Sequence, residues 1–181
     1  MTLITADFIL TCNEGFEIIE NGAMLFDERI IEVGKCEELK AKHPTATIIE
    51  TPQNSVILPG LINAHVHLEF SANQSMLRYG DFIVWLQSVI KHREELSALA
   101  TTELIGSKLQ EMLKNGTTSL GAISSFGADL EACVQAPQRV VYFNEVLGSV
   151  PSAVDAMYGD FRGRLETSKE FKSERFIPAV S

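Results

Sequence analysis

Short apolar and β-branched runs separated by turn residues fill the first part of the chain. The runs cover residues 3–11, 22–26, 29–33 and 46–50. Runs of this length, bounded by Asn, Gly and Asp, are typical of strands joined by tight turns. The pattern therefore predicts a small antiparallel sheet, with a short helix over residues 35–42 that ends at a His-Pro pair. Because His43 precedes a helix-ending proline, we expect it to be exposed and not to be a ligand.

Farther along the chain, apolar residues recur at helical spacing. Asp81 stands in the N-cap position of the first such helix, whose apolar stripe consists of Phe82, Trp85, Leu86, Val89 and Ile90. We expect this stripe to be buried. Further helices are expected over residues 102–114, 128–136 and 152–172, the last with a glycine interruption, and strands over residues 117–123, 139–145 and 176–181. Strands that alternate with helices are typical of a parallel α/β array.

The change from short strands to alternating strands and helices predicts two domains. We assign residues 1–55 to a small β domain and residues 56–181 to the α/β array. The second segment contains about four strands, half of the eight that a closed (β/α)8 barrel needs.

Between these segments lies the most informative stretch, an apolar run from Val56 that is broken by Pro59-Gly60 and leads into His65 and His67. Residues two apart in a strand point to the same side, so both imidazoles are expected on one face. Two neutral imidazoles at a strand end suit zinc or iron(II), which bind nitrogen about 2.0–2.1 Å away. A bare His-x-His is equally compatible with a structural histidine pair.

The flanking residues favour the metal site. Pro-Gly-Leu-Ile-Asn-Ala-His-Val-His-Leu-Glu-Phe-Ser, residues 59–71, closely resembles the signature of the amidohydrolase superfamily. In that superfamily this element forms the first strand of a metal-bearing (β/α)8 barrel. The resemblance implies an α/β fold in which this chain is the N-terminal half of the barrel beside a small β-sandwich. It also implies a divalent metal, zinc or iron(II), held in part by His65 and His67.

Two further carboxylates follow predicted strands. Glu69 has the same parity as the histidines, so it faces the mouth of a pocket if the strand continues that far; the alternative is a solvated loop carboxylate. Glu145 ends the strand over residues 139–145, where the C-terminal face of a barrel could present it to substrate. Both are candidate substrate-binding residues.

Glu94 is the third candidate for substrate binding. It continues the row of Phe82, Leu86 and Ile90 at steps of four, which aligns a carboxylate with the apolar stripe. The spacing resembles that of superfamily members that deaminate adenosine-like nucleosides, in which the matching Glu holds the ribose hydroxyls. The alternative is a surface glutamate.

Over its whole length the chain is most similar to the aminodeoxyfutalosine deaminases. The matching phrases lie at residues 63–71, 79–90 and 121–124. The resemblance implies metal-dependent hydrolytic deamination of a small-molecule nucleoside, 6-amino-6-deoxyfutalosine of menaquinone biosynthesis. Guanine, methylthioadenosine or chlorohydrolase-like activity stays open, as does a non-catalytic half-barrel that pairs with a second chain.

The half-barrel interpretation has consequences of its own. In the superfamily, later segments bring another metal-ligand histidine, an aspartate and the general acid/base groups, none of which we find here. We therefore expect this chain to be inactive alone. Its open barrel edge could pair with another copy in a homodimer.

Composition narrows the possible partners. The formal net charge of −9 over 181 residues disfavours nucleic acid, because phosphate binding needs a basic surface. No apolar run is long enough for a membrane span, and the N-terminus does not resemble a signal peptide, so we expect a cytoplasmic protein. Cys12, Cys36 and Cys133 are widely spaced, which predicts reduced, mostly buried thiols and no disulfide or thiolate zinc site.

Overall fold

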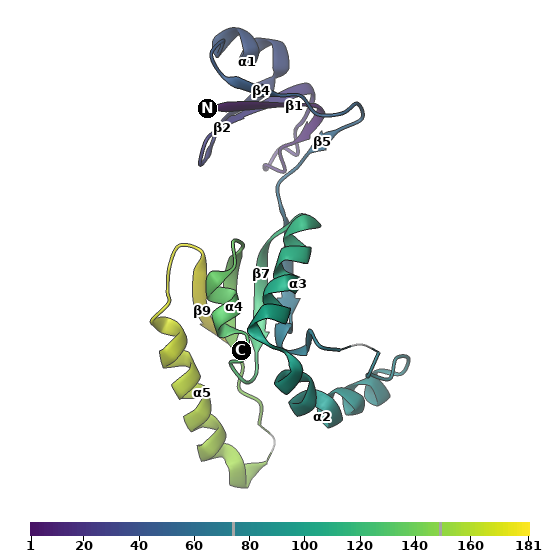
Figure 1. Cartoon of the computed structure of the whole chain (residues 1–181), viewed down its shortest axis with the longest axis vertical. Coiled ribbons are helices and arrows are strands. Elements are labelled where there is room, and N and C mark those ends of the chain that lie inside the picture. Colours follow the sequence, from purple (N-terminus) through teal and green to yellow (C-terminus); the bar gives the residue numbers. More distant parts are fainter. Residues whose placement is uncertain (74, 149) are drawn as a thin grey trace. The chain divides into compact units, whose positions relative to one another are not determined.

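The computed structural model describes residues 1–73, 75–148 and 150–181, and the chain divides into two compact units, Met1–Pro59 and Gly60–Ser181 (Figure 1). The division lies a few residues beyond the predicted boundary between residues 55 and 56. Each unit has its own sheet, and Pro59-Gly60 separates the two sheets along the chain.

The first unit is built on one five-stranded sheet with strand order β3-β2-β1-β4, in which β5 also pairs with β1. Its elements are β1 (Thr2–Leu10), β2 (Ile18–Phe26), β3 (Ile30–Lys35), α1 (Cys36–Lys42), β4 (Thr47–Ile49) and β5 (Val56–Ile57). Leu3, Ala23, Leu25 and Leu39 form its core. The expected β-sandwich is thus represented here by one sheet with α1 packed against it.

The prediction of an antiparallel sheet is only partly right. The pairs β1–β2 and β2–β3 are antiparallel, but β4 and β5 both run parallel to β1. Helix α1 is the reason for the first parallel pair, because a crossover through a helix returns the chain in the same direction. The prediction that His43 is exposed is wrong: at the end of α1 it is partly buried, and its Nε2 lies 3.0 Å from Glu32 Oε2.

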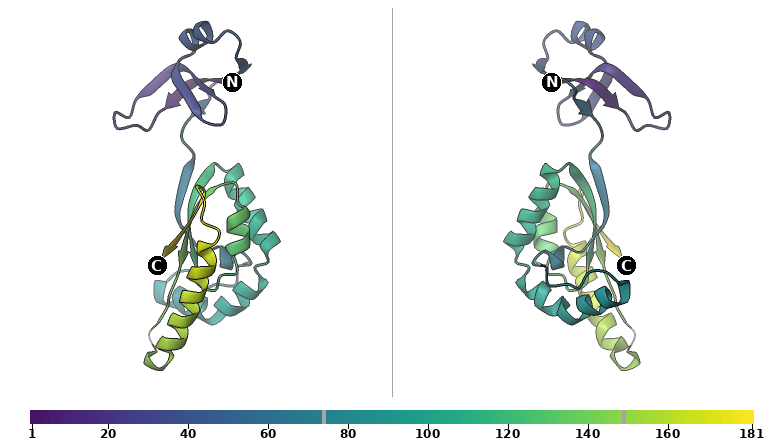
Figure 2. Two further views of the ribbon diagram at one scale, coloured as in Figure 1. Left: turned by 90° about the vertical axis from the view of Figure 1, so that its left-hand side faces the viewer. Right: turned by 90° about the vertical axis from the view of Figure 1, so that its right-hand side faces the viewer.

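The second unit is a four-stranded parallel sheet of order β6-β7-β8-β9 with helices along its strands (Figure 2). Its strands are β6 (Leu61–Val66), β7 (Thr117–Ser124), β8 (Arg139–Asn144) and β9 (Phe176–Val180). Its helices are η1 (Leu68–Phe70), α2 (Phe82–Leu99), α3 (Thr102–Lys114), α4 (Leu130–Gln135), η2 (Pro151–Ala153) and α5 (Val154–Lys169). The predicted α/β order is confirmed, and α5 continues through its glycines without the expected interruption.

The apolar core of this unit lies between the sheet and the layer of α3 and α4. It includes Leu68, Ile105, Leu109, Leu120, Cys133, Val140, Tyr142 and Phe176. Of the three cysteines only Cys133 is fully buried, while Cys12 is exposed, so the expectation of mostly buried thiols is wrong for Cys12. No helix among the described residues has the length and apolar character that a membrane crossing requires.

Helix α2 differs from its prediction. Asp81 caps it as expected, since its Oδ1 accepts hydrogen bonds from the backbone N–H groups of Ile83 and Val84 at 2.9 and 3.3 Å. However, Phe82 is 64% exposed and Ile90 is 59% exposed, so the predicted buried stripe is wrong for these residues. Helical spacing shows which face is apolar, but burial also requires an element opposite that face.

Candidate metal and substrate site

The two histidines converge at the C-terminal end of β6. Their Nε2 atoms are 3.2 Å apart, and the ring centroids are separated by 5.1 Å with an angle of 67° between the rings. The predicted common face of His65 and His67 is therefore present in the structure. The end of β6 is the end at which parallel α/β barrels place their active sites.

An irregularity in strand pairing lies at this histidine pair. The register between β6 and β7 shifts between Asn63 and Val66, the segment that contains His65. Opposite this segment stands Gly121 of β7, where a Cβ atom would overlap the carbonyl oxygen of Ala64. Glycine at this position lets β6 approach β7 closely, and bulges of this kind commonly redirect a side chain near an active site.

His67 is partly buried against Phe70, with the two rings stacked at 5.5 Å between centroids. Burial lowers the pKa of the His67 imidazole, and the nearby charge of Glu145 opposes that shift. Its Nδ1 is buried and, within the described part of the chain, has no hydrogen-bond partner. The neutral imidazole that burial favours is the form that binds metal ions.

The pair fits two ligands of one metal ion. Two nitrogens about 2.0–2.1 Å from a metal at a near-tetrahedral angle lie about 3.3 Å apart, close to the 3.2 Å between the two Nε2 atoms. A catalytic zinc normally has three protein ligands and a water. The described residues contain no cluster of three or more His, Cys, Asp or Glu side chains that could hold a metal.

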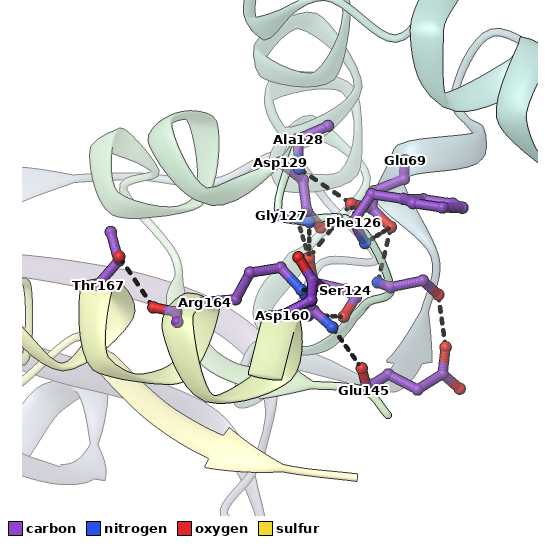
Figure 3. A network of polar contacts seen from close by, with 12 residues as sticks. Glu69, Ser124, Phe126, Gly127, Ala128, Asp129, Glu145, Asp160, Arg164 and Thr167 are labelled. Carbon is purple, nitrogen blue, oxygen red and sulfur yellow. Dashed lines mark hydrogen bonds and ion pairs between the residues drawn. The ribbon is translucent and has the colours of Figure 1, made fainter. Parts of the chain in front are cut away.

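Glu69 occupies a different place from the one predicted. Strand β6 ends at Val66 and a 3-10 turn follows, so strand parity no longer applies at Glu69. The side chain is completely buried and binds the turn between β7 and α4 (Figure 3). It therefore faces neither a pocket mouth nor solvent.

Asp129, close to Glu69, is a second buried acid, and it was not predicted from the sequence. Asp129 Oδ1 accepts hydrogen bonds from the hydroxyls of Ser124 at 2.6 Å and Tyr142 at 2.9 Å. Burial and the charge of Glu69 raise the pKa of Asp129 to about 7. Burial likewise raises the pKa of Tyr142 above its usual range, so its phenol stays a hydrogen-bond donor.

Glu145 lies just beyond β8, near His67, as the strand-end prediction required. Its carboxylate accepts a hydrogen bond from the Ser125 hydroxyl, and its backbone carbonyl accepts one from Arg164 at 2.8 Å. It lines a cavity of about 290 Å³ together with Arg93, Ser125, Phe126, Val146, Leu147, Ala156, Met157, Asp160 and Arg164. This cavity lies beside the C-terminal ends of β7 and β8, since Ser125 and Glu145 directly follow these strands.

Glu94 is exposed on the last part of α2. The neighbouring Arg93 guanidinium lies over the Phe126 ring, 5.6 Å from its centroid, at the same cavity that Glu145 lines. The structure thus brings the two histidines together and places Glu145 where its charge acts on His67, although the described lining of the cavity includes neither histidine. Glu94 lies on α2.

One signal could have found the missed residues. Ser124 ends β7, Ser125 and Asp129 follow it, and the C-terminal ends of neighbouring parallel strands meet at one edge of a sheet. The polar segment after β7 therefore had to lie beside the segment after β6, which carries His67 and Glu69.

Comparison with known proteins identifies the family of this chain. The model of the Amidohydrolase family matches residues 56–178. The chain belongs to the amidohydrolase family. Its parallel sheet, flanking helices and strand-end histidines are thus the first part of an amidohydrolase (β/α)8 barrel.

Two curated amidohydrolase relatives are deaminases. The aminodeoxyfutalosine deaminase of a Nitratiruptor species is 47% identical over 164 residues, which are 91% of this chain and 40% of the relative. The adenosine deaminase of Helicobacter pylori is 36% identical over 147 residues, 81% of this chain and 36% of the relative. The chain thus spans about two fifths of the length of these relatives.

Solved amidohydrolase structures agree. The Helicobacter pylori aminofutalosine deaminase in complex with methylthio-coformycin superposes with a TM-score of 0.87 and 31% identity, covering 99% of this chain and 43% of that one. The atrazine chlorohydrolase of Arthrobacter aurescens complexed with zinc superposes with a TM-score of 0.76 at 20% identity, covering 99% of this chain and 46% of that one. The second likeness shows the fold alone.

Proposed function

We propose that this chain forms the metal-bearing first part of an aminohydrolase that deaminates an adenosine-like nucleoside in the cytoplasm. The observation that carries the proposal is the convergence of His65 and His67 at the C-terminal end of β6. The substrate we propose is 6-amino-6-deoxyfutalosine of menaquinone biosynthesis, because the relative named for that deamination is 47% identical over 91% of the chain.

The residues take distinct roles in this proposal. His65 and His67 hold a divalent metal, zinc or iron(II), through Nε2. When bound, that metal supplies an activated water by lowering its pKa. Glu145, held by Ser125, borders the cavity that receives the substrate, and Glu94 binds the ribose hydroxyls. We assign no general acid or base to this chain.

A chimera tests this function. The chain replaces the matching two fifths of the Nitratiruptor deaminase, and ammonia release is measured with 6-amino-6-deoxyfutalosine, adenosine and guanine. We expect turnover of the first substrate to exceed that of the other two. A chimera that folds and binds metal but prefers guanine would contradict the proposed substrate.

The metal assignment has its own test. Replacing both His65 and His67 with alanine should abolish bound metal in the chimera, as measured by elemental analysis. The matched control replaces His43 and His92, whose imidazoles contact Glu32 and Glu95 respectively, and should leave metal content unchanged. Unchanged metal content after loss of the strand-end pair would contradict the assignment.

The role of Glu94 is tested by substrate analogues. A hydrogen bond to a charged group contributes about 1.5–3 kcal/mol, so a carboxylate that accepts ribose hydroxyls should matter strongly for binding. Glu94→Gln in the chimera should lower kcat/KM for a ribonucleoside much more than for its 2′,3′-dideoxy analogue. Equal losses on both would make Glu94 a structural residue.

We further propose that the isolated chain associates with itself through its sheet edges and is inactive alone. β6 and β9 are the outer strands of the second sheet, and Ile62 is 74% exposed while Val180 is 57% exposed. Outer strands with apolar side chains invite pairing with another chain. Sedimentation velocity should show dimers or larger species, and a monodisperse monomer with deaminase activity would contradict both statements.

A further inference from the structure

The Glu69 carboxylate is completely buried and is enclosed by hydrogen-bond donors. It is 0% exposed, and its two oxygens accept hydrogen bonds from three backbone N–H groups of the turn after β7 (Figure 3). These donors are Ser125 at 2.7 Å, Phe126 at 3.0 and 3.1 Å, and Ala128 at 3.0 Å. Neighbouring N–H groups that point inward from a turn form a preferred site for an anion.

This arrangement ties together two segments that are far apart in sequence. Glu69 comes two residues after His67, and its partners lie 56 to 59 residues farther along the chain. The turn that holds it contains Gly127 at a φ of +83°, a conformation that a side chain would strain. Because the donors are backbone groups, the carboxylate fixes the path of the turn and, with it, the segment that follows β6.

The same turn also holds Glu145. Ser125 donates its backbone N–H to Glu69 and its hydroxyl to the Glu145 carboxylate. Arg164 links the ends of β7 and β8, because its guanidinium donates to the carbonyls of Ser124 at 3.2 Å and Glu145 at 2.8 Å. A continuous set of contacts therefore runs from Glu69 through Ser125 to Glu145, which borders the cavity and whose charge acts on His67.

We propose that Glu69 is a positioning residue that holds Glu145 and the histidine pair in register and does not itself touch substrate. The proposal rests on the proposed metal-dependent function for its consequence, and on the contacts above for its geometry. It replaces the substrate-binding role predicted from strand parity, because both oxygens of Glu69 are already occupied by protein donors.

Three variants of the chain, each made in the chimera with the Nitratiruptor deaminase, test it. In Glu69→Gln an amide NH₂ faces backbone N–H donors, so some of the hydrogen bonds to this side chain are lost. Ser125→Ala keeps the backbone contact to Glu69 and removes only the hydroxyl that reaches Glu145. Asp129→Asn is the matched control, since Asp129 is also 0% exposed and its side chain bonds to Ser124 and Tyr142, not to Ser125 or Glu145. Ser124 also donates to Glu69 at 3.3 Å, and asparagine keeps the Oδ1 acceptor that holds Ser124 in place.

Two measurements are made on each variant, the dissociation constant for Zn²⁺ alone and the NMR signals of the His67 imidazole without metal. Residues that orient metal ligands typically affect metal affinity by about 10–100-fold. We expect that loss for Glu69→Gln, a smaller one for Ser125→Ala, and little further loss when the two are combined, because they act through one path. We expect shifted His67 signals in both variants and unchanged signals in Asp129→Asn.

The outcomes separate this proposal from the proposed function. An unaltered chimera that binds no Zn²⁺, with His67 signals that shift in Glu69→Gln, would overturn the function and support the positioning role. Wild-type binding that persists unchanged in Glu69→Gln, or an equal loss in Asp129→Asn, would overturn the positioning role. If Glu69→Gln does not fold, Ser125→Ala decides, since unchanged His67 signals in that variant would also overturn it.

Discussion

Helices α2 and α3 begin alike and are buried differently. Both have a side-chain N-cap, Asp81 on α2 and Thr101 on α3. On α3 the apolar residues Ile105 and Leu109 are 0% and 1% exposed, whereas Ile90 on α2 is 59% exposed. The two helices have similar caps, but α3 has the more amphipathic sequence and its apolar face packs into the core of the second unit.

The α3 side also has its polar groups buried. Asp129 precedes α4, which packs beside α3, and is enclosed with Ser124 and Tyr142. Dense apolar packing and a buried acid occur together there, because the core that covers α3 also removes water from Asp129. On α2, Leu96 is fully buried and the buried Glu69 lies in the 3-10 turn that contacts this helix, but Phe82, Ile83 and Ile90 are exposed. We infer that α3 contributes more to stability than the first half of α2.

The largest expected effect comes from truncating a core residue of α3, and an exposed residue of α2 serves as the comparison. Ile105→Ala should destabilise the chain by about 2–5 kcal/mol, because it leaves a cavity in the core. Ile90→Ala should change stability by no more than about 0.5 kcal/mol. Urea unfolding of both variants measures this, and equal losses would show that α2 is packed as tightly as α3.

A pH titration tests the buried acid. The pKa of Asp129 is raised from 3.8 to about 7, so the folded chain retains a proton that the unfolded chain releases. This stabilisation is complete below about pH 4 and is lost as the pH rises through 7. At about 1.4 kcal/mol per pKa unit the total is up to about 4 kcal/mol.

Asp129→Asn should remove that dependence. Stability measured by urea unfolding from pH 4 to pH 8 should fall less steeply in the variant than in the unaltered chain. Identical pH profiles would mean that Asp129 does not retain its proton in the folded state.

A smaller effect is expected at Gly121, on the strand that α3 covers. Gly121→Ala should cost about 1–3 kcal/mol, because the added methyl group overlaps the Ala64 carbonyl and must push β6 away from β7. It should also weaken Zn²⁺ binding, since His65 follows Ala64. Gly106→Ala within α3 is the control: apart from its own helix backbone, no atom lies within 4 Å of the added Cβ, and stability should rise by about 0.5–1 kcal/mol.

The smallest effects should be equal on the two helices. Removing either cap, by Asp81→Ala or by Thr101→Ala, should cost about 1 kcal/mol, because a cap bonds only to its own first turn. Thermal unfolding of both variants measures this. A cost at Thr101 alone would show that α2 forms independently of the cooperative unit.

Much of the local structure was predictable from sequence. The common face of His65 and His67, the N-cap at Asp81 and the alternation of strands and helices follow from periods of 2 and 3.6 and from capping chemistry. These features depend on neighbours within a few positions, so the linear pattern contains the information. The family signature around the histidines then indicated the metal chemistry.

Tertiary contacts decided the rest. The apolar run from Val56 looked like one strand, yet β5 and β6 join different sheets, because Pro59-Gly60 allows the chain to leave one sheet and enter another. Glu69 looked like an extension of the histidine strand, yet the turn after β7 supplies the N–H groups that bury it. The sequence determined which residues could pair, and only the folded chain brought donors 56 residues away to the carboxylate they enclose.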